Sequence, residues 1–260
     1  MLRLISFALI ISPLFALGEV KGQPDTIVLE NTEIRGVVTS AGIVSLINPR
    51  DIYRADIISH GSSWGRTKIV YREGSDDWRE TDATADRIVM AEKGTVKIVN
   101  SDTGNPLVVE KVFTLNETGI DLDINIRSVA KQGIRIGDLA LALPWRMAEG
   151  ESPEYIFEQC FTKHHFISGD GSFIYFTKPS GMPPFIMVLP RKGTKLEYFD
   201  SDSIGYKAYI LSERSSALVK SGTWRQPNTG CDLAPGGESG SSVSYGFRFR
   251  WAHSWDEMRE

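Results

Sequence analysis

The sequence has few of the residues from which metal and redox centres are built. Its 260 residues include only two cysteines and four histidines. No HExxH or CxxC motif occurs, and no aspartate-rich stretch has the spacing of a calcium loop. Acidic and basic residues are mixed along the chain with a net charge of -4, so no basic stripe indicates nucleic-acid binding. We therefore expect no metal, no cofactor and no nucleic-acid partner.

Long apolar runs are absent after the first 18 residues. Residues 1–18 combine Arg3 with a mostly apolar stretch over 4–17, and they end in the small-x-small cleavage pattern ALG. This arrangement is typical of a secretory signal peptide and is too short for a membrane span. We therefore expect a secreted, extracellular protein with no membrane segment once residues 1–18 are removed.

Secretion gives the two cysteines a possible structural use. In an oxidising compartment, Cys160 and Cys231 can form a disulfide, and the alternative is two buried free thiols. Asn116 begins the sequence Asn-Glu-Thr, which matches a glycosylation sequon. Asn116 is therefore a candidate glycosylation site in a host that modifies such sequons.

Helical periodicity is scarce before Ser254, whereas strand patterns recur every ten residues or so. Residues 120–126 alternate strictly between apolar and polar side chains, which is typical of an antiparallel strand with one solvated face. Residues 136–145 are more continuously apolar, as in a strand that is covered on both faces. The sequence predicts an all-β fold, with one large two-sheet antiparallel sandwich over residues 19–253.

The last residues carry a different pattern. Ser254 is followed three residues later by Glu257, which is the capping-box spacing that opens a helix. A helix as short as residues 254–260 is marginal alone. We therefore expect these residues to begin a helical region of a longer protein. The alternative is a short helix that docks on the sandwich.

Several segments resemble a known fold, the β-supersandwich or galactose-mutarotase-like domain. In a family of secreted proteins, such a domain precedes a six-hairpin glycosidase-like barrel. The segments that resemble these proteins are 29–51, 108–128, 136–145, 163–179, 193–200 and 245–260. Together they cover much of the chain after residue 18.

The resemblance implies that catalysis and structural support belong to different domains. The catalytic carboxylates of such enzymes lie in the barrel, so this chain is expected to be a non-catalytic domain that braces the barrel and shapes a glycan cleft. Its expected partners are carbohydrate and the C-terminal helical barrel of the same full-length protein. Two alternatives remain: an aldose epimerase-like or other carbohydrate-active enzyme acting alone, and a carbohydrate-binding module.

The adjacent His164 and His165 are the most conspicuous candidates for chemistry. Neighbouring side chains of a strand point to opposite faces, so the two histidines are not expected to share one ion. Residues 168–172, SGDGS, predict a turn between two strands. In the epimerase alternative, a histidine, with His165 preferred, acts as the acid and Glu197 as the base. Further carboxylate candidates for glycosidase chemistry are Glu154, Glu158, Asp200 and Asp202.

Tryptophan and arginine recur close together in two loops rich in glycine and serine. Exposed aromatic rings in such loops are plausible platforms for sugars, with arginine as a partner for hydroxyl groups. The alternative is that these rings cover the edge of the sandwich or pack on the barrel. The candidate carbohydrate-binding residues are Trp64, Arg66, His165, Trp224 and Arg225.

Overall fold

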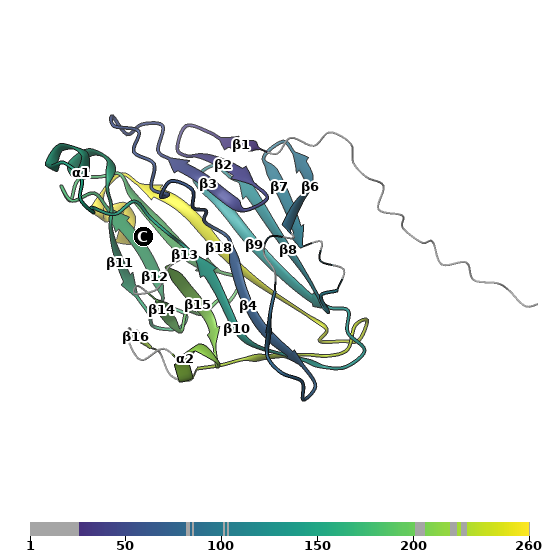
Figure 1. Cartoon of the computed structure of the whole chain (residues 1–260). Coiled ribbons are helices and arrows are strands. Elements are labelled where there is room, and N and C mark those ends of the chain that lie inside the picture. The colour runs from purple at the N-terminus through teal and green to yellow at the C-terminus, as the bar shows by residue number, and fades with distance from the viewer. Residues whose placement is uncertain are drawn as a thin grey trace, which may run out of the picture.

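The computed structural model describes residues 26–81, 84, 86–100, 102, 104–200, 206–218, 223–224 and 228–259. Antiparallel strands dominate this part of the chain (Figure 1), which confirms the predicted all-β sandwich. The expected signal peptide lies outside the described residues and stays a prediction. In the part that is described, no helix is both long and apolar enough to cross a membrane.

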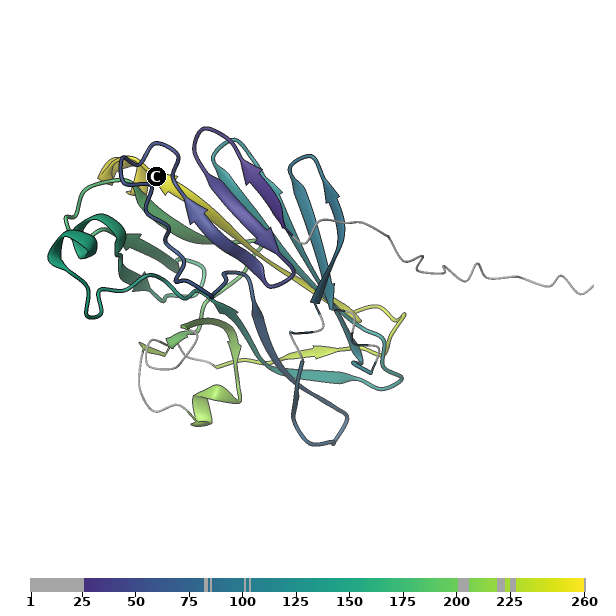
Figure 2. The same cartoon turned by 45° about the horizontal axis from the view of Figure 1, so that its top comes forward.

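The larger sheet has eight strands in the order β11-β12-β13-β18-β9-β8-β7-β6. It forms one layer of the sandwich in Figure 2, and β18 and β9 run through its centre. The strands are β6 (Asp86–Glu92), β7 (Thr95–Asn100), β8 (Leu107–Leu115), β9 (Gly119–Ser128), β11 (Thr162–Phe166), β12 (Phe173–Thr177), β13 (Phe185–Arg191) and β18 (Ser242–Ala252).

The facing sheet has seven strands and is built around β10. Its order is β16-β14-β15-β10-β4-β5, and β17 also pairs with β10. The strands are β4 (Thr67–Glu73), β5 (Arg79–Glu80), β10 (Ile134–Ala142), β14 (Tyr198–Asp200), β15 (Lys207–Ser212), β16 (Thr223–Trp224) and β17 (Cys231–Leu233).

A third sheet of three strands covers another part of the eight-stranded layer. It consists of β1 (Ile27–Glu30), β2 (Arg35–Thr39) and β3 (Gly42–Ile47). A side chain at Gly36 would place its Cβ 2.6 Å from the Cδ1 atom of Ile120 on β9. Glycine at this position therefore lets β2 lie directly against the larger sheet.

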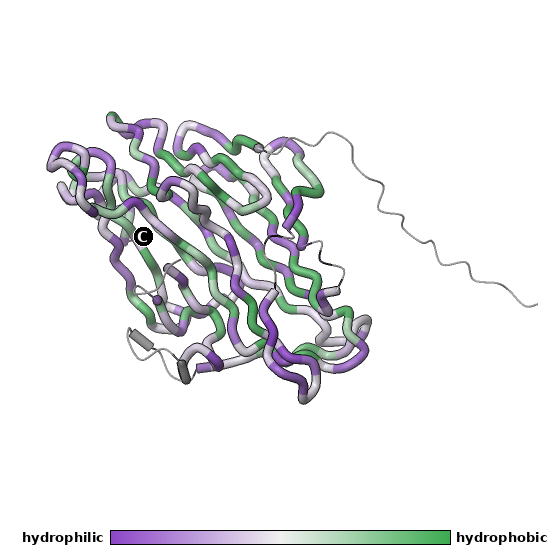
Figure 3. Tube along the Cα trace, viewed as in Figure 1, coloured by the Kyte–Doolittle hydropathy of each residue, from purple (hydrophilic) through white to green (hydrophobic). Residues whose placement is uncertain are grey.

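The core lies between the layers, and the sequence patterns locate it correctly. Ile120, Leu122, Ile124 and Ile126 are fully buried on β9, and the polar residues between them are partly exposed. The strand β10 is buried over most of its length on both faces, as its continuous apolar run predicts. Figure 3 shows hydrophobic and hydrophilic residues alternating along the long strands.

Three short helices interrupt the strands: α1 (Pro153–Gln159), α2 (Ser215–Leu218) and α3 (Trp255–Arg259). The N-cap bond of the capping box predicted for α3 is formed, and the reciprocal bond shifts by one residue, from the Ser254 amide to the His253 amide. The Glu257 backbone amide donates to Ser254 Oγ at 3.1 Å, and the His253 amide donates to Glu257 Oε2 at 2.7 Å. Sequence reasoning missed α1, although Ser152 followed by proline is a helix-start signal.

Candidate functional site

The two histidines lie on β11, in the hairpin that the sequence predicts. The strands β11 and β12 are antiparallel neighbours, with His165 opposite Ile174. Gly169 in the connecting turn has a φ of 62°, a left-handed conformation that glycine adopts at little cost. His164 and His165 point to opposite faces, as expected: the first stacks on Tyr175 of the same sheet and the second on Phe199 of the facing sheet.

His165 belongs to a cluster of aromatic and basic side chains between the sheet edges. The centre of its ring lies 5.3 Å from the centre of the Phe199 ring, and Lys163 Nζ lies 3.9 Å from that same centre. Trp145 and Tyr206 continue the cluster with ring centres 4.5 Å apart. Burial lowers the pKa of His165, and the nearby Lys163 ammonium lowers it further. His165 is therefore a neutral ring at neutral pH, able to donate one hydrogen bond and to accept another.

His164 belongs instead to a row of rings on the outer face of the hairpin. It stacks on Tyr175 at 4.7 Å, and Tyr175 stacks on Phe173 at 6.1 Å. Phe166 lies 5.8 Å from Phe173 and is 53% exposed. The Nε2 atom of His164 lies 3.1 Å from Thr177 Oγ1. The structure therefore gives the two histidines separate surroundings.

Glu197 is buried and holds backbone and side chains together. It is 1% exposed. Ser212 Oγ donates to its Oε2 at 2.6 Å, and the Thr229 backbone amide donates to both carboxylate oxygens at 2.9 and 3.0 Å. The Thr229 hydroxyl donates to Oε1 as well. This carboxylate therefore fastens the segment around Thr229 to the end of β15.

Glu197 borders a cavity of about 370 Å³, together with Lys195, Thr229 and Tyr245. Burial raises the pKa of the Tyr245 phenol well above its usual range, and the adjacent Cys231 thiol adds to the effect. This phenol stays protonated at neutral pH and serves as a hydrogen-bond donor rather than as a base.

The structure separates the proposed carbohydrate-binding residues. Trp64 was expected in an exposed loop, and this is wrong: its side chain is 0% exposed and packs on Phe176 and Phe249. Its indole N–H donates to the Pro144 carbonyl at 2.8 Å.

Arg66, two residues after Trp64, is exposed. Trp224 lies on β16, but its side chain is not among the described features, and Arg225 lies outside the described residues.

The cysteines are both described and both free, so the expected disulfide is absent from the structure. Cys160 is buried at the end of α1, where its Sγ lies 3.3 Å from the Met147 carbonyl oxygen. Cys231 lies on β17, opposite Ile136 of β10. The two thiols are held in different environments by different elements.

Asn116 lies in the turn between β8 and β9. Its Oδ1 accepts hydrogen bonds from the backbone amide and the hydroxyl of Thr118 at 3.0 and 3.2 Å. Its Nδ2, the atom that would carry a glycan, is covered and has no hydrogen-bond partner. In this arrangement the sequon is folded into a turn whose acceptor nitrogen is not accessible.

The remaining acids of the sequence prediction are scattered. Glu154 and Glu158 lie on α1, Asp200 is 4% exposed at the end of β14, and Asp202 lies outside the described residues. Among the described residues, no group of three or more histidine, cysteine, aspartate or glutamate side chains could hold a metal ion.

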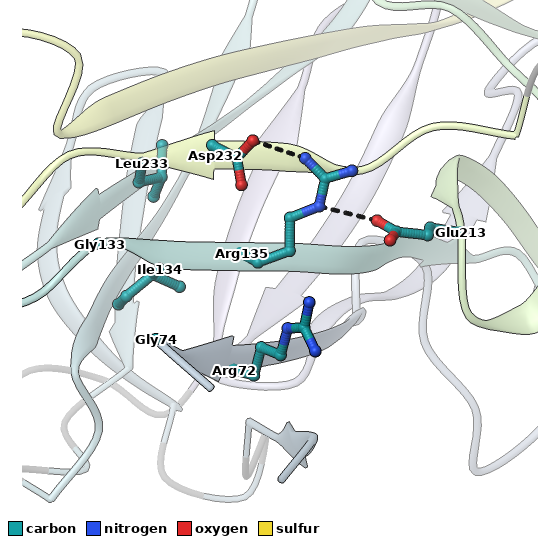
Figure 4. A pocket seen from close by; sticks show the side chains of 8 residues that line it. All are labelled: Arg72, Gly74, Gly133, Ile134, Arg135, Glu213, Asp232 and Leu233. Atoms are coloured by element: carbon teal, nitrogen blue, oxygen red, sulfur yellow. Dashed lines mark hydrogen bonds and ion pairs between the residues drawn. The ribbon is translucent and has the colours of Figure 1, made fainter. Parts of the chain in front are cut away.

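Two further hollows lie on the surface. A charged groove of about 530 Å³ lies on the outer face of the seven-stranded sheet and is drawn in Figure 4. A largely apolar groove of about 310 Å³ lies near α1, between Ile52, Phe157 and Met182. At its base, Lys178 Nζ lies 2.6 and 2.7 Å from the two carboxylate oxygens of Asp51.

Neither the protein-family models nor the curated proteins give a match to this sequence. Solved structures do match. A polysaccharide lyase superposes with a TM-score of 0.63 over 90% of this chain at 10% identity. The matched region is 33% of the lyase, so the chain spans about a third of that protein's length.

Smaller proteins share the fold over their whole length. A galactose mutarotase-like protein from Lactobacillus casei ATCC 334 matches with a TM-score of 0.53 and 9% identity, over 87% of this chain and 100% of its own. A candidate aldose 1-epimerase from Escherichia coli K12 matches with a TM-score of 0.52 and 11% identity, over 88% and 99%. The chain therefore has the galactose-mutarotase-like sandwich fold. The helical barrel stays a prediction.

Proposed function

We propose that this chain is the non-catalytic sandwich domain of a secreted carbohydrate-active protein. It braces a C-terminal helical barrel and forms one wall of a glycan cleft. Secretion is supported by the signal-peptide pattern of residues 1–18. The role within a longer protein is supported by the match to a third of a polysaccharide lyase over 90% of this chain.

The observation that carries the proposal is the burial and hydrogen bonding of Glu197, which is the base in the epimerase alternative. A general base must lie within hydrogen-bond reach of the substrate proton. Glu197 is 1% exposed, and Ser212 and Thr229 already donate to its oxygens. His165 meanwhile stacks on Phe199. Both candidates for acid-base chemistry therefore have structural roles, which favours chemistry in another part of the protein.

One observation favours the epimerase alternative. The galactose mutarotase-like protein from Lactobacillus casei is matched over 100% of its length, so a sandwich of this kind also occurs as a separate protein. The proposal and this alternative differ in two measurable respects: the length of the gene product and its activity on aldoses.

The first test is to sequence the coding region beyond the codon for Glu260. A continuation with the periodicity of paired helices supports the proposal, and a stop codon directly after Glu260 overturns it.

The second test follows mutarotation of galactose by polarimetry. We expect the purified protein and its His165→Ala variant to give the buffer rate. Catalysis that is lost in His165→Ala, and retained when the exposed His60 is replaced by alanine, establishes the epimerase instead.

A further inference from the structure

The groove of Figure 4 crosses three strands of the seven-stranded sheet and carries two arginines on neighbouring strands. Arg72 on β4 lies directly opposite Arg135 on β10, and both side chains point the same way in Figure 4. Like charges directly opposite one another destabilise a strand pair. The fold nevertheless places two arginines side by side, so the positive charge of Arg72 has a role other than stabilising the strand pair. The lining residues are Arg72, Gly74, Gly133, Ile134, Arg135, Glu213, Asp232 and Leu233.

Arg135 is neutralised within the protein. Its Nε donates to Glu213 Oε2 at 2.9 Å, and its Nη1 donates to Asp232 Oδ2 at 2.7 Å. These two carboxylates, from β17 and from the end of β15, hold the Arg135 guanidinium in a fixed position (Figure 4). Arg135 is therefore a rigid wall of the groove.

Arg72 differs from its neighbour, because no carboxylate pairs with it among the described residues. Its guanidinium carbon lies 4.8 Å from the ring centre of Trp78, and its Nε is covered without a hydrogen-bond partner. The ring contact orients the cation without cancelling its charge. The part of Arg72 that remains for a ligand is its pair of terminal nitrogens, which form the free end of the side chain in Figure 4.

Other residues hold Trp78 and its surroundings in place. A Cβ atom at Gly137, where the β10 register shifts, would lie 2.6 Å from the indole ring, so glycine makes room for Trp78. Arg214 lies on the ring as well, at 5.4 Å. The buried carboxylate of Asp138 fixes the Arg214 backbone, because its Oδ1 accepts a hydrogen bond from the Arg214 amide at 3.0 Å.

We propose that this groove binds the carboxylate or sulfate group of an acidic glycan through Arg72. Arginine forms paired hydrogen bonds with such planar or tetrahedral anions. Glu213 and Asp232 line the same groove and can accept hydrogen bonds from sugar hydroxyls, and their negative charges favour a ligand with one anionic group over a polyphosphate chain. The choice of a glycan as the carrier of the anion rests on the proposed function.

The test is calorimetric titration of the purified protein with three probes: a galacturonate oligomer, a sulfated galactose oligomer and a neutral galactose oligomer. We expect at least one acidic oligomer to bind, more weakly at high ionic strength, and the neutral one not to bind. Arg72→Gln should weaken binding about tenfold or more, and Arg72→Lys should weaken it less. Arg127→Gln removes the same charge from the other sheet and should have no effect.

Thermal unfolding of each variant verifies that it is folded. Trp78→Phe adds a second readout, because an oligomer bound at Arg72 should change the fluorescence of the wild type but not that of this variant. Equal affinity of wild type and Arg72→Gln overturns the groove as the site while leaving the proposed function intact. If neither acidic oligomer binds, the inference fails, whereas the coding-region test decides the proposed function independently.

Discussion

At the scale of single residues, burial decides which polar side chains are structural. Glu197 receives hydrogen bonds from two residues that are distant in sequence, Ser212 and Thr229. We expect Glu197→Gln to lower the free energy of unfolding by about 1–3 kcal/mol, because its amide group would face donors instead of accepting from them. Urea unfolding measures the loss. The exposed Glu238→Gln is the matched control, and equal stability of the two variants contradicts the structural role.

Trp64 gives a second residue-scale prediction. Its ring is fully buried against Phe176 and Phe249. Trp64→Ala should cost about 3–5 kcal/mol of stability, whereas Trp64→Phe should cost less because it refills part of the space. Chemical denaturation compares the two. A surface sugar platform would instead give a stable Trp64→Ala protein that has lost glycan binding.

The histidines make stability depend on pH. Burial is the main cause that lowers the pKa of both His164 and His165 below the ordinary histidine value of about 6.5. The unfolded chain therefore binds more protons than the folded protein just below that pH, so stability is complete above about pH 6.5 and falls as the pH decreases.

Unfolding in urea between pH 5 and pH 8 tests this dependence. The pH effect should be smaller in His165→Gln than in the wild type, and the exposed His60→Gln should leave it unchanged. A wild-type free energy of unfolding that rises on acidification from pH 7 to pH 5 would contradict the stated sign.

At the scale of elements, local patterns predict well, and partners between elements do not follow from them. The alternation over 120–126 gives β9 its buried face, and Ser254 with Glu257 gives α3 its start. In contrast, the sequence places Trp78 next to Arg79, whereas the ring stacks on Arg72 and Arg214. Those contacts depend on strand register and on the shift in β10, which no short-range pattern encodes.

A buried ion pair joins β6 to β8 and gives a prediction for this edge of the larger sheet. Lys111 is 0% exposed on the core side of β8, and its ammonium pairs with Asp86 of β6. We expect Asp86→Ala to cost about 3–5 kcal/mol, because it leaves a buried charge without a partner.

The double variant Asp86→Ala with Lys111→Met should recover much of that loss, since it removes both charges. Urea unfolding of the single and double variants measures the coupling. Glu110→Gln breaks the partly exposed Lys97–Glu110 pair between β7 and β8 and should cost about 1 kcal/mol or less. A double variant no more stable than Asp86→Ala would show that packing, not charge, dominates at this position.

At the scale of the whole molecule, the sandwich of facing antiparallel sheets follows from many short strands with alternating faces. The pairing of cysteines does not, because it depends on where α1 and β17 lie in space. Cys160 is fixed by its position after α1, next to the Met147 carbonyl, whereas Cys231 is fixed by β17 pairing with β10. Secretion into an oxidising compartment favours disulfides, but it does not determine the distance between the two cysteines in the fold.

The free thiols lead to the last prediction. A disulfide between Cys160 and Cys231 would close a loop of about 70 residues and contribute about 4 kcal/mol, so reducing it would lower the Tm by about 10 °C. The structure instead predicts the same Tm with and without a reducing agent, and two titratable thiols per denatured chain. In the native protein, Cys160 should react slowly, since burial both covers its thiol and raises its pKa. A large drop in Tm on reduction, with no free thiol before it, would restore the disulfide.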